Sequence, residues 1–210
     1  RGMPALAGHA PHPFGSLAEV RGAGGFSREV GVVLVGAEHP GAGDMTSIKR
    51  VLKHLFYGRL YLAKRFPASS KAAITEAIAQ SESRHMGELS FVVEPDLDWH
   101  DLFRGVTPRQ RAVEVFSRLH IWDTEHNSGV LIYLLFADSC VEIVADRGIH
   151  ACVGDAQWKA ICSEMESSFR EGMFEQGVLA GIARISDLLE KHFPAQGANP
   201  NELPNEPELL

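Results

Sequence analysis

Residues 129–146 read GVLIYLLFADSCVEIVAD, and they carry the strongest structural signal in the chain. The first half, GVLIYLLFA (129–137), is almost entirely apolar, which is typical of a strand covered on both faces. Asp138 and Ser139 favour a tight turn, after which CVEIVAD (140–146) returns as a second strand. The stretch therefore predicts a buried antiparallel hairpin.

Upstream of the hairpin, helix and strand signals alternate. Pro67 suits the first turn of a helix that runs to about Arg84, and ELSFVVEP (88–95) has the β-branched and aromatic content of a buried strand. DLDWHDLFRG (96–105) is expected to be an irregular link. Thr107 and Pro108 then match the cap and first residue of a helix over 107–120.

Downstream of the hairpin, RGIHACVG (147–154) is compatible with a helical turn or with a brief strand. Asp155 is expected to cap a helix through Arg170, and Gly172 to end it. A last helix is predicted over 175–192. This order of elements predicts an α/β fold, a three-layer α/β/α sandwich around a short mixed sheet of about four strands.

The chain divides into four parts by composition. Residues 1–44 are rich in Gly, Ala, Pro and His without a lasting period, so we expect a disordered extension. Residues 45–66 are a basic amphipathic segment, and 67–193 form the folded domain. The Pro- and Asn-rich tail 194–210 is expected to be either mobile or draped on the surface.

The basic segment TSIKRVLKHLFYGRLYLAKRF (46–66) contains six Lys and Arg residues and no acid. Its apolar residues at helical spacing, opposite the basic positions, are Ile48, Val51, Leu52, Leu55 and Phe56. Gly58 is expected to break the helix. Two interpretations follow: a helix whose apolar face packs on the domain, or a helix that contacts a membrane surface or a partner.

Composition excludes some classes of function. A formal charge of −7 argues against a nucleic-acid-binding protein. The cysteines Cys140, Cys152 and Cys162 lack the spacing of a zinc site and are interpreted as reduced, buried thiols. No signal peptide or membrane-spanning stretch is visible, so we expect a soluble cytoplasmic protein, with peripheral contact to the inner membrane through 46–66 as an option.

Acidic residues flank the ends of the predicted hairpin strands. Antiparallel pairing would bring Asp123 and Glu125, before the first strand, beside Asp146, at the end of the second. Carboxylate oxygens of this kind suit Ca²⁺ or Mg²⁺. Arg147 could bind a phosphate or carboxylate with its donor fork, with Asn127 nearby. The competing interpretation is structural, in which Asn127 shapes a turn and Asp146 forms a local pair or cap.

Other polar motifs give weaker signals. DLDWHD (96–101) offers Asp96, Asp98 and Asp101, but it lacks the register and the final Glu of an EF-hand loop.

Several motifs together resemble a known family, the TPM domain. They are GELSFVVE, then NSGVLIYLLFADSCVEIVADRGI, then W-x-x-I-C-x-x-M-x-x-x-F-x-x-G-x-F-x-x-G-x-x-x-G-I, over about residues 67–193. The family includes thylakoid-lumen and photosystem II repair proteins, bacterial envelope proteins and an animal receptor accessory protein. The tail motif N-P-N-E-L-P-N-E-P resembles a soluble bacterial branch.

The resemblance implies an α/β/α sandwich and leaves the activity open. Some members have been called acid phosphatases and some bind calcium, while bacterial relatives often accompany LemA-type membrane proteins. We therefore expect a non-enzymatic accessory or interaction module for a membrane or envelope complex. A divalent-metal-dependent phosphatase-like hydrolase is the alternative, for which no nucleophile is evident in the sequence.

Overall fold

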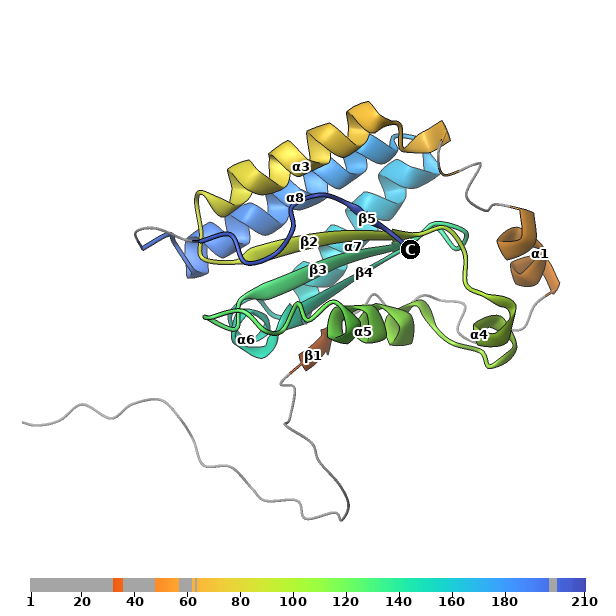
Figure 1. Cartoon of the computed structure of the whole chain (residues 1–210), viewed down its shortest axis with the longest axis horizontal. Helices are drawn as coiled ribbons and strands as arrows, with labels where there is room; N and C mark the ends of the chain where they lie inside the picture. The colour runs from red at the N-terminus through yellow and green to blue at the C-terminus, as the bar shows by residue number, and fades with distance from the viewer. Residues whose placement is uncertain (1–31, 36–47, 57–61, 63, 197–199) are drawn as a thin grey trace, which may run out of the picture.

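A five-stranded mixed sheet organises the protein (Figure 1). The computed structural model describes residues 32–35, 48–56, 62, 64–196 and 200–210. The strand order is β1-β4-β3-β2-β5. The bounds are β1 Val32–Val35, β2 Glu88–Glu94, β3 Gly129–Leu135, β4 Cys140–Asp146 and β5 Glu208–Leu209. β2 pairs in parallel with β3 and β5, whereas β4 is antiparallel to β3 and β1.

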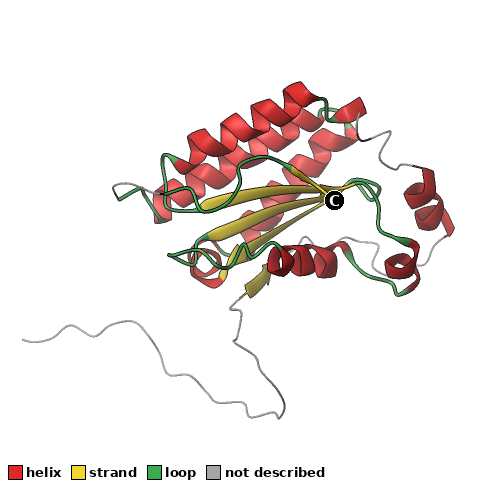
Figure 2. Ribbon diagram, in the orientation of Figure 1, coloured by secondary structure: helices red, strands yellow, loops and turns green. Residues whose placement is uncertain are grey.

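Helices cover both faces of this sheet, which confirms the three-layer α/β/α fold (Figure 2). One face carries α3 (Ala68–Glu82), α7 (Asp155–Arg170) and α8 (Phe174–His192), whose apolar side chains form one core cluster with the sheet. The other face carries α5 (Pro108–Arg118), which packs in a second cluster. Three shorter helices, α1 (Ile48–Phe56), α4 (Trp99–Phe103) and α6 (Arg147–Val153), lie at the ends of the sheet.

The predicted hairpin is confirmed. β3 is buried along its whole length, and it pairs with β4 in a register that joins Val130 to Ala145. The turn over 136–139 contains Ser139 at a φ of 51°. At the start of β3, a Cβ atom on Gly129 would lie 1.9 Å from the carbonyl oxygen of Ile121. Glycine is therefore required where the chain enters the central strand.

Helix boundaries follow the capping signals in part. Thr107 and Gln110 form a capping box at the start of α5, with Pro108 as first residue, as predicted. α7 differs, because its cap is Gly154 at a φ of 80° and Asp155 is its first residue. The segment 96–105 is not wholly irregular. It contains α4, a helix of five residues that is too short to show a hydrophobic period.

The segments outside the domain also differ from the predictions. The four residues of β1 lie within 1–44 and form an edge strand, so disorder is wrong for them; the rest of 1–44 lies outside the described residues. Gly58 also lies outside them. The tail is draped on the surface rather than mobile over 200–210, with Pro207 buried and β5 added to the edge of β2. RGIHACVG forms helix α6.

Two of the three cysteines are buried as expected. Burial raises the pKa of the Cys140 and Cys162 thiols well above the ordinary value. Cys152 is exposed on α6, which contradicts the expectation for that residue.

Candidate functional site

The predicted ion site at the amino end of β3 is not assembled. Asp146 is buried, and its Oδ2 accepts a hydrogen bond of 2.8 Å from the backbone N–H of Gly129. Desolvation by burial outweighs that bond and raises the pKa of Asp146 to about 6. The carboxylate therefore closes the end of the hairpin, because it accepts the N–H of Gly129 where β3 begins.

Of the other residues predicted there, Arg147 directly follows Asp146, whereas, among the described residues, Asp123 and Glu125 form no ligand group with it. Asp123 and Glu125 are exposed, and the backbone N–H of Glu125 donates to the carboxylate of Glu202 in the tail. They belong to no group of three ligand residues in the described part of the chain. Asn127 adopts a φ of 50° in a turn, and Arg147 is exposed as the first residue of α6. The structural interpretation therefore fits Asn127 and Asp146.

Two further carboxylates at this end were not anticipated. Glu82 Oε1 accepts from the N–H of Leu89 at 2.9 Å, and burial raises the pKa of Glu82 to about 7. Glu88 Oε2 accepts from the N–H groups of Glu202 and Leu203, which fixes the tail beside β2. In the sequence, the only sign of these two roles is that Glu82 ends helix α3 and Glu88 begins strand β2.

The carboxyl end of β2 is built around Glu94. Arg111 donates two hydrogen bonds to the Glu94 carboxylate, from Nε at 2.9 Å and from Nη2 at 2.8 Å. The Tyr133 hydroxyl donates a third, at 2.6 Å. These bonds raise the pKa of Arg111. Burial, together with the Glu94 charge, raises that of Tyr133. The network is satisfied by its own members, so it positions the site rather than offering free groups.

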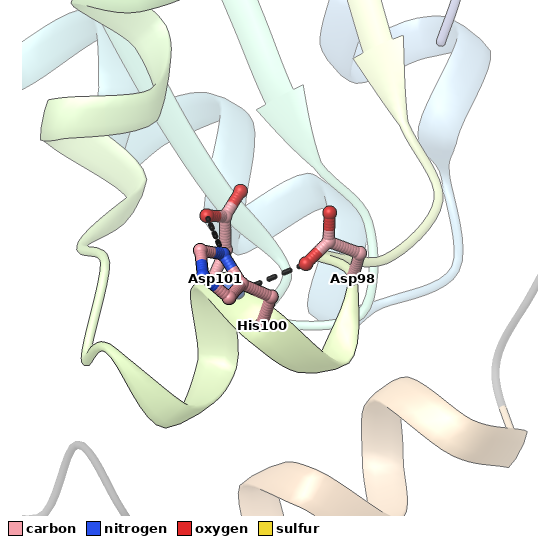
Figure 3. Close-up of side chains that lie close together, drawn as sticks. All are labelled: Asp98, His100 and Asp101. Atoms are coloured by element: carbon pink, nitrogen blue, oxygen red, sulfur yellow. Dashed lines mark hydrogen bonds and ion pairs between the residues drawn. The ribbon is translucent and has the colours of Figure 1, made fainter.

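An open acidic pocket of about 310 Å³ lies beside this network. Its lining includes four carboxylates, those of Glu94, Asp96, Asp98 and Asp101. Asp98, His100 and Asp101 place ligand atoms within 4.8 Å of one another at the start of α4 (Figure 3). Asp98 Oδ1 also accepts from the N–H of Asp101 at 2.9 Å, so it serves as the helix cap. Carboxylates and an imidazole are chemically able to bind a divalent cation.

Exposed apolar side chains gather on the helices near this pocket. On α4, Trp99 and Phe103 are 71% and 70% exposed, and their rings meet edge to face with centroids 6.3 Å apart. On α1, Ile48 and Leu52 are 78% and 46% exposed. Met173, in the turn between α7 and α8, is also exposed. Contiguous exposed apolar side chains, such as the Trp99–Phe103 pair, are typical of interaction surfaces.

Helix α1 is attached to the domain through polar side chains. His54 is 4% exposed; its Nδ1 accepts from the N–H of Leu97 at 2.9 Å, so Nε2 donates to Asp138 at 3.1 Å. Arg50 bonds Asp138 at 2.9 Å and the carbonyl of Val106 at 3.3 Å. Burial opposes ionisation of Asp138, but the bonds from His54 and Arg50 hold its pKa below the ordinary value.

This attachment bears on the two interpretations of the basic segment. Ile48 and Leu52 are exposed, which argues against packing of these two side chains on the domain, whereas His54 and Arg50 contact the domain. The reason is that Asp138, the Leu97 N–H and the Val106 carbonyl all present polar partners to this face of the helix. α1 therefore exposes Ile48 and Leu52 to solvent. No helix in the described ranges is long and apolar enough to cross a membrane.

Comparisons with known proteins agree with this fold. The family model described as TPM domain matches residues 62–188. No curated protein matches the chain. The NMR structure of the BA42 protein from the psychrophilic bacterium Bizionia argentinensis is similar, with 30% sequence identity and a TM-score of 0.61. The match covers 68% of this chain and 94% of that one. The chain therefore belongs to the TPM domain family.

Proposed function

We propose that this TPM domain is an interaction module that docks on an anionic membrane surface. The contact would be made by the end of the molecule that carries the carboxyl ends of β2 and β3 (Figure 1). We call this region the docking end and define it by its exposed apolar side chains, which are Ile48, Leu52, Trp99, Phe103 and Met173.

The exposed Ile48 and Leu52 of α1, together with the exposed aromatic pair of α4, carry the proposal. Trp and Phe are favoured where one side of a helix meets the boundary between lipid headgroups and acyl chains. Burial of each such side chain stabilises the bound state by roughly 1.5–3 kcal/mol when it is complete. The two helices are neighbours, because Leu97 and Val106, which flank α4, both bond α1.

The positive charge of the segment 46–66 favours an anionic membrane surface. The segment 46–66 has six cations and no acid, although the whole chain carries a formal charge of −7. Lys53 and Lys64 are exposed in this segment. Each cation near an anionic leaflet contributes about 1 kcal/mol, an attraction that salt screens. The exposed Lys53 and the exposed apolar side chains of α1 thus lie on one helix, whereas Asp98 and Asp101 at the start of α4 would oppose the attraction to an anionic surface.

Sedimentation of the full chain with lipid vesicles tests this docking. We expect binding to vesicles that contain phosphatidylglycerol, weaker binding to pure phosphatidylcholine, and weakening with added salt. Trp99→Ser with Phe103→Ser should reduce binding at least tenfold, while Trp122→Ser, the same change at the opposite end of β3, should not. Failure of the parent chain to bind anionic vesicles overturns the proposal. So does binding only to a membrane protein, such as a LemA-type partner, with bare vesicles left unbound.

A divalent-cation site on α4 is a second candidate, and it would be the basis of any metal-dependent hydrolase activity. The specific observation is the grouping of Asp98, His100 and Asp101 beside the acidic pocket. Hard oxygen ligands favour Ca²⁺ or Mg²⁺, whereas the imidazole also suits transition metals. A bound ion would offset the repulsion among the carboxylates that line the pocket.

Calorimetric titration with Ca²⁺, Mg²⁺ and Mn²⁺ tests the second candidate. Asp98→Asn keeps a capping oxygen for α4 but removes a charge, so it should weaken binding without unfolding the helix. Asp123→Asn is the control, because Asp123 is exposed and outside the group. Hydrolysis of a generic phosphate ester by the parent and by Asp101→Asn tests catalysis. Equal rates would reject the hydrolase, and identical titrations of parent and Asp98→Asn would reject the site.

A further inference from the structure

A second pocket, of about 250 Å³, lies between α1, the hairpin turn and the turn that joins α7 to α8. It combines an aromatic floor with a basic rim. The floor is formed by Phe136, Phe169 and Phe174, and the rim by Lys53, Arg65 and Arg170. Its lining also includes Gly172, which precedes the exposed Met173 of the docking end.

The aromatic floor is rigid because it belongs to the core. Phe169 and Phe174 stack with ring centroids 5.0 Å apart, and Phe136 lies 5.1 Å from Phe174. All three side chains are buried. The guanidinium carbon of Arg65 lies 5.5 Å from the centroid of the Phe174 ring, and its Nη1 donates to the Gly172 carbonyl at 3.5 Å. This cation therefore lies over the edge of the aromatic floor.

The pocket is strongly positive although the chain is acidic. Its lining residues include three cations and no carboxylate. Asp138 lies next in sequence to two lining residues, but Arg50 and His54 bond its carboxylate. Lys53 and Arg170 are both exposed. In the described part of the chain, neither of them forms an ion pair with an acid. Arg170 also suits the last turn of α7, whose dipole favours a cation. Lys53 likewise lies in the last turn of its helix, α1.

We propose that this pocket binds the phosphate of an anionic phospholipid headgroup. Lys53, Arg65 and Arg170 would donate to the phosphate oxygens, and the glycerol end of the lipid would contact the phenylalanine floor. The proposal rests on membrane docking as the function and adds a specific headgroup site to it.

Titration with dihexanoyl phosphatidic acid, a short-chain lipid below its micelle concentration, tests the pocket without a bilayer. We expect saturable NMR shifts at the amides of Ser139 and Gly172. Lys53→Gln should weaken binding roughly tenfold, because a charged hydrogen bond is lost. Lys64→Gln removes the same charge from the same exposed segment outside the pocket lining, so it should change binding less than about twofold.

Each outcome decides a separate point. Absence of saturable shifts, or equal effects of Lys53→Gln and Lys64→Gln, overturns the headgroup site. If glycerol 3-phosphate binds as tightly as the lipid, the site recognises a soluble phosphate ester, and the lipid assignment is overturned. Vesicle binding without short-chain binding leaves docking intact and rejects the pocket. Short-chain binding without vesicle binding rejects docking instead.

Discussion

At the amino ends of β2 and β3, the carboxylates of Glu82, Glu88 and Asp146 accept backbone N–H groups, and Glu82 and Glu88 also line an open pocket of about 340 Å³. At the carboxyl end of β2, carboxylates line a pocket of about 310 Å³, and the adjoining helix α4 exposes two aromatic side chains. The amino end holds Glu82, Glu88 and Asp146, each committed to fixing a neighbouring segment. The carboxyl end holds the exposed aromatic residues and both pockets considered above. In open α/β sheets, ligands bind outside the carboxyl ends of the strands.

The difference teaches that acidic residues near a sheet edge do not identify a site by themselves. Asp146 and Asp98 are both carboxylates beside the end of a strand. Asp146 meets a buried N–H and closes the fold, while Asp98 meets an exposed helix start and stays open to solvent. Changes at the amino end should therefore reduce stability, and changes at the carboxyl end should reduce binding.

The largest expected effect is that of Gly129→Ala at the amino end. The new Cβ would meet the Ile121 carbonyl at 1.9 Å, so the entry to β3 must shift. We expect a loss of roughly 3 kcal/mol or more in the free energy of unfolding, measured with urea. Gly148→Ala is the matched control, because its Cβ would lie 4.0 Å from the nearest atom outside its neighbours. Similar losses in both variants would contradict the packing described for β3.

Asp146→Ala should have the next largest effect. It leaves the Gly129 N–H buried without its acceptor, which costs about 1–3 kcal/mol. Asp146→Asn keeps an acceptor oxygen and should lose less. Asp123→Ala, at an exposed position, should change stability by less than about 0.5 kcal/mol. Should Asp123→Ala prove as damaging as Asp146→Ala, the structural role assigned to Asp146 alone would be wrong.

A smaller effect is expected in the pH dependence of stability. Because burial raises the pKa of Glu82 from 4.5 to about 7, the folded protein holds this proton more tightly than the unfolded chain. The contribution of Glu82 is therefore complete below pH 4.5 and is lost as the pH rises to about 7.

Comparison of the parent with Glu82→Gln isolates this contribution. The stability difference, parent minus variant, should fall between pH 4.5 and 7, by at most about 1.4 kcal/mol per pH unit. The comparison is needed because His85 acts in the opposite direction: burial lowers its pKa from 6.5 to about 4. A stability difference that is flat with pH would show that Glu82 is ionised at lower pH than its burial implies.

The smallest effect on stability is expected at the carboxyl end. Trp99→Ser with Phe103→Ser removes side chains that are mostly exposed, so the free energy of unfolding should change by less than about 0.5 kcal/mol per site. Vesicle binding should nevertheless fall. A large loss of stability would mean that the aromatic pair packs on the domain, and the contrast between the two ends would then disappear.

Sequence reasoning located the buried elements better than the sites. The hairpin and the Thr107–Pro108 start of α5 were predictable because continuous apolar runs and capping chemistry are local signals. The five-residue helix α4 was missed because one turn of helix shows no period. Strand β1 was missed because its four residues gain stability from pairing with β4, a contact distant in sequence.

The direction in which a side chain points was the main thing that sequence could not supply. The period of α1 indicated a helix, but the partners offered by Asp138 and Leu97 decided that Arg50 and His54 turn inward. The carboxylate of Asp146 likewise follows the N–H of Gly129 rather than Asp123 or Glu125. In both cases the orientation depends on a backbone or side-chain partner in another element.

Both outer edges of the sheet are covered by very short strands, β1 along β4 and β5 along β2. A bare edge presents a row of unpaired N–H and C=O groups on which a second chain can add, and this is the first step of edge-to-edge aggregation. The two short strands therefore cover the edges of β4 and β2 and limit the addition of a second chain to the sheet. Trimming either of them during protein engineering would be expected to shorten shelf life before it altered the fold.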